Sequence, residues 1–191
     1  MSRLIYLTHP QVVIDPNVPV PEWGLSQVGT SRVALAVSRD AFAGVTHVVS
    51  SAEKKAVETA GPIASALGLT VEIREAMHEN DRSATGFLPG PEFERVADTF
   101  FADPGVSVRG WETARDAQAR IVAEVTSVRS ANMGTVLCVG HGGVGTLLMC
   151  HLANVEISRH FDQGPGGGGS VFCHEPSLPF QTGWTAMENW T

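Results

Sequence analysis

Two histidines, His9 and His141, each follow directly on a short apolar segment, residues 4–7 and 135–139. Such segments predict buried strands. The carboxyl ends of parallel strands meet at one edge of a sheet, so we expect the two imidazoles to lie close together. Imidazole changes its charge near neutral pH and can act as a nucleophile, a base or a hydrogen-bond donor. The pair therefore predicts a site for group transfer or for binding a small anion.

Helices alternate with these strands along the chain. Ser26 precedes a helical pattern, and Ser50 and Ser51 are expected to cap a second helix. The expected helices are 27–37, 52–67, 112–128 and 143–152, and the expected strands are 4–7, 45–50, 69–73, 135–139, 170–173 and 182–187. This alternation predicts a three-layer α/β/α sandwich with a mainly parallel central sheet.

Residues 75–110 interrupt the alternation, because they are polar, rich in turn residues and only weakly periodic. We predict a single domain over residues 1–191, in which this segment is an excursion that covers one end of the sheet. Residues 164–169, Gly-Pro-Gly-Gly-Gly-Gly, are too short for a linker between domains. They are either a flexible turn or a loop whose amides approach an anion.

The overall charge limits the partners. The net charge is −7 and no run of Lys or Arg occurs, so neither nucleic acid nor an anionic membrane is expected to bind. No apolar run is long enough for a secretory signal or a membrane span, and the three cysteines show no CxxC spacing. We expect buried free thiols and a cytoplasmic location.

Four segments, in order along the chain, resemble the histidine phosphatase superfamily, also called the phosphoglycerate mutase-like family. Residues 4–10, Leu-Ile-Tyr-Leu-Thr-His-Pro, are similar to its Arg-His-Gly opening, and residues 23–29 to its Leu-Thr-x-x-Gly segment. Residues 48–60 follow its Ser-Ser-x-x-x-Arg-Ala-x-x-Thr-Ala pattern, and residues 136–143 match the strand of its second histidine. The resemblance implies the phosphoglycerate mutase-like fold.

The resemblance also implies roles for individual side chains. His9 would be the nucleophile that forms a phosphohistidine, and His141 would stabilise charge on the phosphoryl oxygens. Lys55, at the position of a family Arg, would bind phosphate together with the amides of its helix. Glu79 lies where the family carries its general acid, and Glu75 is the alternative.

Two departures weaken the expected phosphate site. Thr8 replaces the first family Arg and Lys55 the second, which removes two bidentate guanidinium groups. Thr8 and Lys55 remain in the predicted phosphate-binding set. Arg82 completes that set, because it could substitute for a missing Arg, with Arg3 and Arg32 as other candidates.

The favoured function is hydrolysis of a small phosphomonoester through phospho-His9, with no metal and no cofactor. The alternative is a catalytically impaired relative that binds an anionic or phosphorylated ligand, or a protein partner, in the same pocket. A phosphomutase reaction is disfavoured, since nothing in the sequence indicates a closed site that retains the intermediate. The natural substrate and the oligomeric state stay open.

Two other patterns compete with this interpretation. Residues 140–145 fit the GxGxxG motif of dinucleotide-binding proteins, but they lie too late in a short chain for such a fold. His9, His141, Glu75 and Glu79 could in principle ligate a metal, although no HxH or HExxH pair accompanies them.

Overall fold

The central sheet is built from short segments whose side chains alternate between its two faces. The computed structural model describes residues 2–191. Its strands are β1 (Arg3–Thr8), β2 (His47–Ser51), β3 (Val71–Arg74), β4 (Thr135–Gly140), β5 (Ser170–His174) and β6 (Thr185–Ala186). They form one sheet in the order β3-β2-β4-β1-β5-β6, in which β1 to β4 run parallel and β5 and β6 antiparallel to their neighbours.

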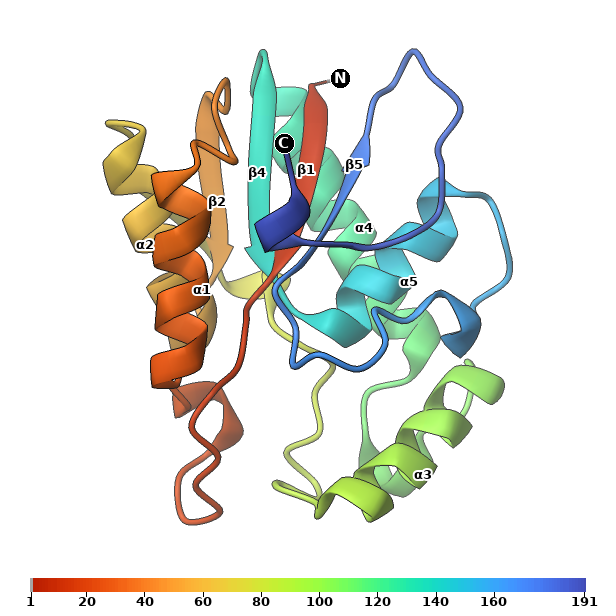
Figure 1. Ribbon diagram of the computed structural model, residues 1–191. Coiled ribbons are helices and arrows are strands. Elements are labelled where there is room, and N and C mark those ends of the chain that lie inside the picture. The colour runs from red at the N-terminus through yellow and green to blue at the C-terminus, as the bar shows by residue number, and fades with distance from the viewer. Residues whose placement is uncertain (1) are drawn as a thin grey trace.

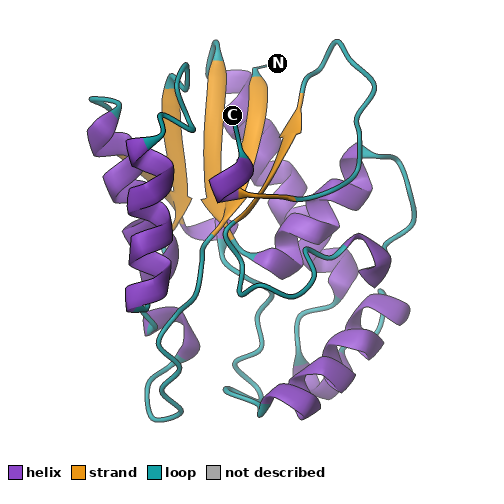
Figure 2. Ribbon diagram, in the orientation of Figure 1, coloured by secondary structure: helices purple, strands orange, loops and turns teal. Residues whose placement is uncertain are grey.

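Helices cover both faces of this sheet (Figures 1 and 2). Ile5 and Leu7 of β1 pack in the cluster that includes α1 and α2, whereas Leu4 and Tyr6 pack in the cluster that includes α4 and α5. The longer helices are α1 (Gln27–Ser38), α2 (Lys54–Ala66), α3 (Gly90–Ala102), α4 (Ala114–Ala131) and α5 (Gly142–Leu152). The predicted three-layer sandwich with a mainly parallel sheet is confirmed.

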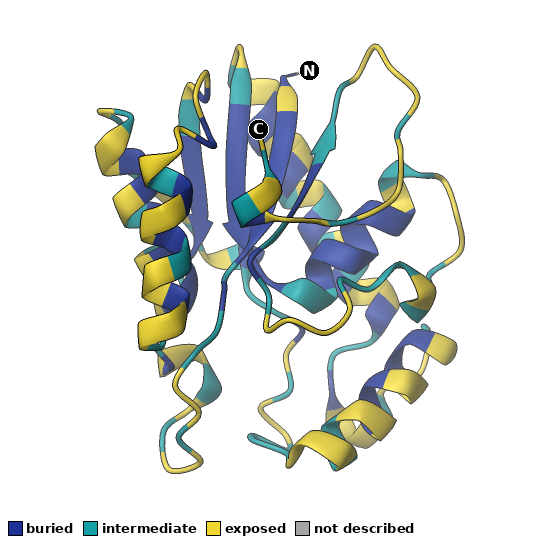
Figure 3. Cartoon of the chain, in the orientation of Figure 1, coloured by how far each residue is buried: buried dark blue, intermediate teal, exposed yellow. Residues whose placement is uncertain are grey.

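Short 3-10 turns join several of these elements. They are η1 (Val20–Glu22), η2 (Glu75–Met77), η3 (Val108–Gly110), η4 (Arg159–Phe161) and η5 (Met187–Asn189). The strands and the inner faces of the helices are buried, and the exposed side chains lie on the outer helix faces and the loops (Figure 3). None of the helices formed by residues 2–191 combines the length and the apolar character needed to cross a bilayer.

The carboxyl ends of the parallel strands share one edge of the sheet. Thr8 pairs with Gly140, and Ser50 pairs with Val139, so the residues that follow β1, β2 and β4 emerge side by side. Helix α3 lies beyond this edge (Figure 1). The sheet register thus positions the residues after the strands for a common site.

Residues 75–110, for which the weak periodicity predicted no helix, contain a regular one, α3. Val96, Phe100 and Phe101 on its inner face are buried, and Phe100 packs near Trp111 with ring centroids 6.1 Å apart. The apolar residues of this helix are spaced for one face, but the proline- and glycine-rich stretch before it masks the signal.

The predicted start of the second helix was also wrong. Helix α2 begins at Lys54, its N-cap is Glu53, and neither Ser50 nor Ser51 caps it in the usual way. Instead β2 extends to Ser51, whose Oγ accepts a hydrogen bond of 3.3 Å from the amide of Glu53. The two serines therefore belong to the strand end, where the hydroxyl of Ser50 donates to the carbonyl of Ser51 (2.9 Å).

Candidate active site

His9 emerges from β1 with its backbone held on both sides. Its amide donates to the carbonyl of Gly140 (3.0 Å), and its carbonyl accepts from the amide of Gly169 (3.0 Å). The Nδ1 atom lies 2.9 Å from the carbonyl of Pro10. A carbonyl only accepts, so Nδ1 carries the proton of the neutral ring and Nε2 keeps its lone pair.

Burial lowers the pKa of His9 to about 4, and the positive charges of Lys55 and Arg82 act in the same direction. The neutral imidazole therefore dominates at neutral pH. A neutral ring with Nε2 unprotonated is the form that a nucleophilic histidine needs.

His141 follows β4 and lies beside His9. The two ring centroids are 5.3 Å apart and the ring planes make an angle of 69°. The hydroxyl of Tyr6 accepts from the amide of His141 (3.1 Å) and donates to its carbonyl (3.2 Å), which fixes the backbone. The strands thus bring together the two histidines that the sequence analysis paired.

The side chain of His141 is fully buried, under polar groups. Its Nε2 lies 2.9 Å from Ser51 Oγ and 3.5 Å from a carboxylate oxygen of Glu53. Nδ1 has no hydrogen-bond partner among the residues that the structure describes. Burial lowers the pKa of His141 well below its usual value and outweighs the opposing effect of Glu53. Only His9 of the pair has exposed surface, so a ligand must approach from that side.

Lys55 is buried, and its ammonium group already has partners. It forms an ion pair with Glu53 and donates to the carbonyl of Val20 (2.9 Å). Burial alone would raise the pKa of Glu53, but Lys55 and the amide of Glu79 help to hold it at about 2. Glu53 is therefore charged, and it neutralises the cation predicted to bind phosphate.

Glu79 caps helix α5. One of its carboxylate oxygens accepts from the amide of Gly143 (3.0 Å), and the other from the amides of Val144 (2.9 Å) and Asn80 (3.0 Å). An added Cβ at Gly143 would lie 2.8 Å from the carboxylate, so glycine permits this approach. Glu75, the alternative acid, is exposed, and no hydrogen bond of its side chain is found within residues 2–191.

Thr8 is fully buried at the end of β1. Its hydroxyl donates to Gln163 Oε1 (2.7 Å) and accepts from the amide of Ser170 (3.0 Å). An added Cβ at Gly142 would lie 2.3 Å from Gln163 Nε2, which places Gln163 beside the start of α5. Thr8 is thus engaged with protein groups rather than open to solvent.

Arg82 stands over the ring of Phe93, with its guanidinium carbon 4.9 Å from the ring centroid. No ion pair or hydrogen bond of this guanidinium occurs within the described chain, so its donors are available.

Arg3 lies at the opposite end of β1 and pairs with Glu175 (3.5 Å). Arg32 pairs with Glu188. Among these three arginines, Arg82 is the one in position to reach the site.

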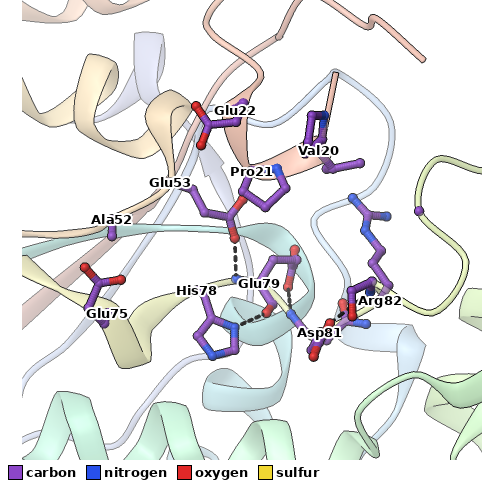
Figure 4. A pocket seen from close by; sticks show the side chains of 14 residues that line it. Val20, Pro21, Glu22, Ala52, Glu53, Glu75, His78, Glu79, Asp81 and Arg82 are labelled. Carbon is purple, nitrogen blue, oxygen red and sulfur yellow. Dashed lines mark hydrogen bonds between the residues drawn. The ribbon is translucent and has the colours of Figure 1, made fainter. Parts of the chain in front are cut away.

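A cavity of about 790 Å³ adjoins this cluster. Glu53, Glu79 and Arg82 line it together with Glu22, Glu75 and His78, and Figure 4 shows these side chains around the opening. The amide of Glu79 donates to Glu53 (2.9 Å), which joins two of the lining residues. The cavity is acidic, with Arg82 as its one arginine.

The carbonyls of the glycine loop, residues 164–169, face a cation of the protein itself. Arg32 donates to the carbonyls of Gly166 (3.2 Å), Gly168 (2.9 Å) and Gly169 (3.5 Å), so the loop wraps around a guanidinium. The sequence singled out this segment, but it did not identify Arg32 as its partner.

Sequence reasoning missed Glu53, Tyr6, Ser51 and Gln163. Ser51 and Glu53 lie in the motif segment 48–60, Ser51 at the end of β2 and Glu53 at the N-cap of α2, and both face the site. That placement was the available signal for both. Tyr6 and Gln163 act through tertiary contacts for which the sequence holds no local signal. Within residues 2–191 no group of three or more His, Cys, Asp or Glu side chains is arranged to hold a metal ion.

The chain belongs to the histidine phosphatase superfamily, branch 1, whose family model matches residues 17–172. The match includes Lys55, Glu79 and His141 and begins after His9. A search of curated proteins found no match.

Solved structures share the fold. YhfR from Bacillus stearothermophilus superimposes with a TM-score of 0.78 at 20% identity, covering 95% of each chain. A mycobacterial glucosyl-3-phosphoglycerate phosphatase in complex with inorganic phosphate gives 0.76 at 20% identity, over 97% of this chain and 95% of that one. Phosphoserine phosphatase from Entamoeba histolytica, in complex with 3-phosphoglyceric acid, gives 0.69 at 17% identity over 90% of each chain.

Proposed function

We propose that this protein hydrolyses small phosphomonoesters without a metal, through a phosphohistidine on His9. One observation carries the proposal: the Nδ1 atom of His9 faces the Pro10 carbonyl at 2.9 Å, which leaves Nε2 unprotonated beside His141. Family membership and structural neighbours that are phosphatases support the same chemistry.

In the proposed reaction the Nε2 lone pair of His9 attacks phosphorus and the bond to the ester oxygen breaks. The leaving oxygen takes a proton from a general acid, Glu79 or the more exposed Glu75. Water then attacks the phosphohistidine and gives a proton back to that carboxylate, which releases inorganic phosphate and restores both Nε2 and the acid. His141 hydrogen-bonds the transferring phosphoryl group, and Thr8, Lys55 and Arg82 complete its surroundings.

The second candidate is an impaired relative that binds an anion, or a protein partner, in the same pocket. The ion pair between Lys55 and Glu53 favours it, because of the two cations in the predicted phosphate-binding set only Arg82 then lacks an acidic partner within residues 2–191. Hydrogen bonds to charged groups contribute about 1.5–3 kcal/mol each, so a paired lysine would lower phosphate affinity considerably. We therefore expect slow turnover with weak substrate binding.

The cavity of about 790 Å³ has room for a small organic leaving group, and we propose a small phosphorylated molecule as the ligand. The three cysteines, Cys138, Cys150 and Cys173, are free, with Cys173 only partly buried. Free thiols suit a reducing compartment, which supports the proposed cytoplasmic location.

Turnover of a generic aryl phosphate by wild type and His9→Ala tests the proposal. We expect hydrolysis by wild type and a loss of about 10³-fold or more in His9→Ala. His151→Ala is the matched control, since His151 is exposed at the far end of α5. Equal rates in wild type and His9→Ala would contradict the nucleophile, and equal, negligible rates would favour the binding function.

A further inference from the structure

We propose that Glu53 determines phosphate affinity by acting as a built-in competitor, whose carboxylate occupies the cationic side of the anion site until a substrate displaces it from Lys55. The inference rests on the proposed function only in taking the cluster of His9, His141 and Lys55 as the anion site. Glu53 would then be a specificity-determining residue of that site.

The contacts of Glu53 are those of a bound anion. One carboxylate oxygen pairs with the Lys55 ammonium. The other accepts from the amide of Glu79 (2.9 Å) and lies 3.5 Å from Nε2 of His141. The side chain is 9% exposed and also lines the cavity of about 790 Å³. A carboxylate with these partners joins the cavity wall to Lys55 and His141, so it holds the ammonium that an anion beside His9 would need.

Phosphate and the Glu53 carboxylate are both anions that would bind the same ammonium group, that of Lys55. The side chain of Lys55 is only 4% exposed, and its remaining protein contact is the neutral carbonyl of Val20. A phosphate that recruits this ammonium must either share it with Glu53 or push the carboxylate away. Two anions close together in a buried site repel strongly, so sharing costs affinity.

The contrasting interpretation is that the ion pair between Glu53 and Lys55 only stabilises the fold. In that case removing the charge of Glu53 leaves a buried ammonium unpaired, which destabilises the fold without improving the site. The two interpretations predict opposite changes in phosphate affinity for a folded variant, and an isosteric amide distinguishes them.

The experiment is calorimetric titration of inorganic phosphate into wild type, Glu53→Gln and Glu22→Gln at neutral pH. We expect Glu53→Gln to bind phosphate about tenfold more tightly or better. Glu22 lines the same cavity, is exposed and has no ion pair within residues 2–191, so Glu22→Gln controls for loss of one negative charge. It should change affinity less than about threefold.

A double-mutant cycle locates the effect on Lys55. The gain from Glu53→Gln should disappear in a Lys55→Gln background, since no ammonium remains to be released. Thermal unfolding of each variant checks that it is folded, and Glu53→Met provides a second neutral side chain of similar length if the amide variant does not fold. A folded Glu53→Gln or Glu53→Met protein that binds phosphate no more tightly than wild type overturns the inference.

Turnover of the aryl phosphate in the same variants separates this inference from the proposed function. Tighter phosphate binding by Glu53→Gln, with no turnover by any variant, would support the role of Glu53 as a competitor and contradict the proposed phosphatase activity. If turnover depends on His9 but phosphate affinity is unchanged in Glu53→Gln, the phosphatase activity is supported and the role of Glu53 as a competitor is contradicted.

Discussion

At the scale of single residues, the chemistry of the site depends on which atoms are already occupied. His9 keeps Nε2 open because Nδ1 faces the Pro10 carbonyl, whereas Lys55 is paired with Glu53. The sequence predicted the types of residue at the site but not these pairings. Pairings of this kind arise from side-chain positions in the folded chain, which neither spacing nor a motif specifies.

The pKa of His9 leads to a testable pH profile. Burial lowers this pKa to about 4, so the neutral nucleophile persists well below pH 6.5 and is lost only as pH falls through about 4. We expect kcat/KM for the aryl phosphate, corrected for ionisation of the substrate, to stay level from pH 7 to about 5 and to fall below that.

Circular dichroism at each pH is the control, because stability changes in the same range. The pKa values of His9 and His141 are both lowered on folding, so the unfolded chain binds more protons between about pH 6.5 and 4. Stability therefore declines as pH falls through this window. An acid limb near pH 6.5 in protein that is still folded would show that His9 is not held neutral by burial.

At the scale of elements, strand ends and a glycine loop hold the site in place. The sequence predicted where β1 and β4 end, since both are apolar runs that stop at a histidine. It did not predict α3, because proline and glycine residues precede that helix, and it placed the start of α2 too early. The role of residues 164–169 could not be decided from composition, because the partner that defines it, Arg32, lies far away in the sequence.

Gly168 tests the loop's hold on His9. Its φ is +80°, and an added Cβ would lie 2.1 Å from the carbonyl oxygen of His9. We expect Gly168→Ala to lower the free energy of unfolding by about 3 kcal/mol or more, and to reduce turnover, because the backbone of His9 must shift.

Gly164→Ala is the matched control in the same loop. Its φ is +73°, but nothing lies within 4 Å of an added Cβ. Only the cost of the left-handed conformation applies, about 1 kcal/mol, and turnover should be retained. Chemical denaturation with both variants measures the difference, and equal losses of stability would mean that the contact with His9 contributes nothing.

At the scale of the whole molecule, the parallel sheet accounts for the site. His9, Ser51 and His141 come from distant parts of the chain, and they meet because β1, β2 and β4 end at the same edge. This convergence follows from a general rule for parallel sheets, so the sequence could predict it. The acidic lining of the adjoining cavity could not be predicted, since it depends on how η1 and the segment after η2 fold over that edge.

A crystal structure of the protein with vanadate, which mimics a phosphoryl group in transfer, tests the central claim most directly. We expect the vanadium atom to be bonded to Nε2 of His9. His141 should be hydrogen-bonded to the vanadate oxygens, and Glu53 should have moved away from Lys55. An anion bound elsewhere, or rings of His9 and His141 that stay in contact with no anion between them at saturating vanadate, would contradict the claim that these two histidines form one phosphoryl site.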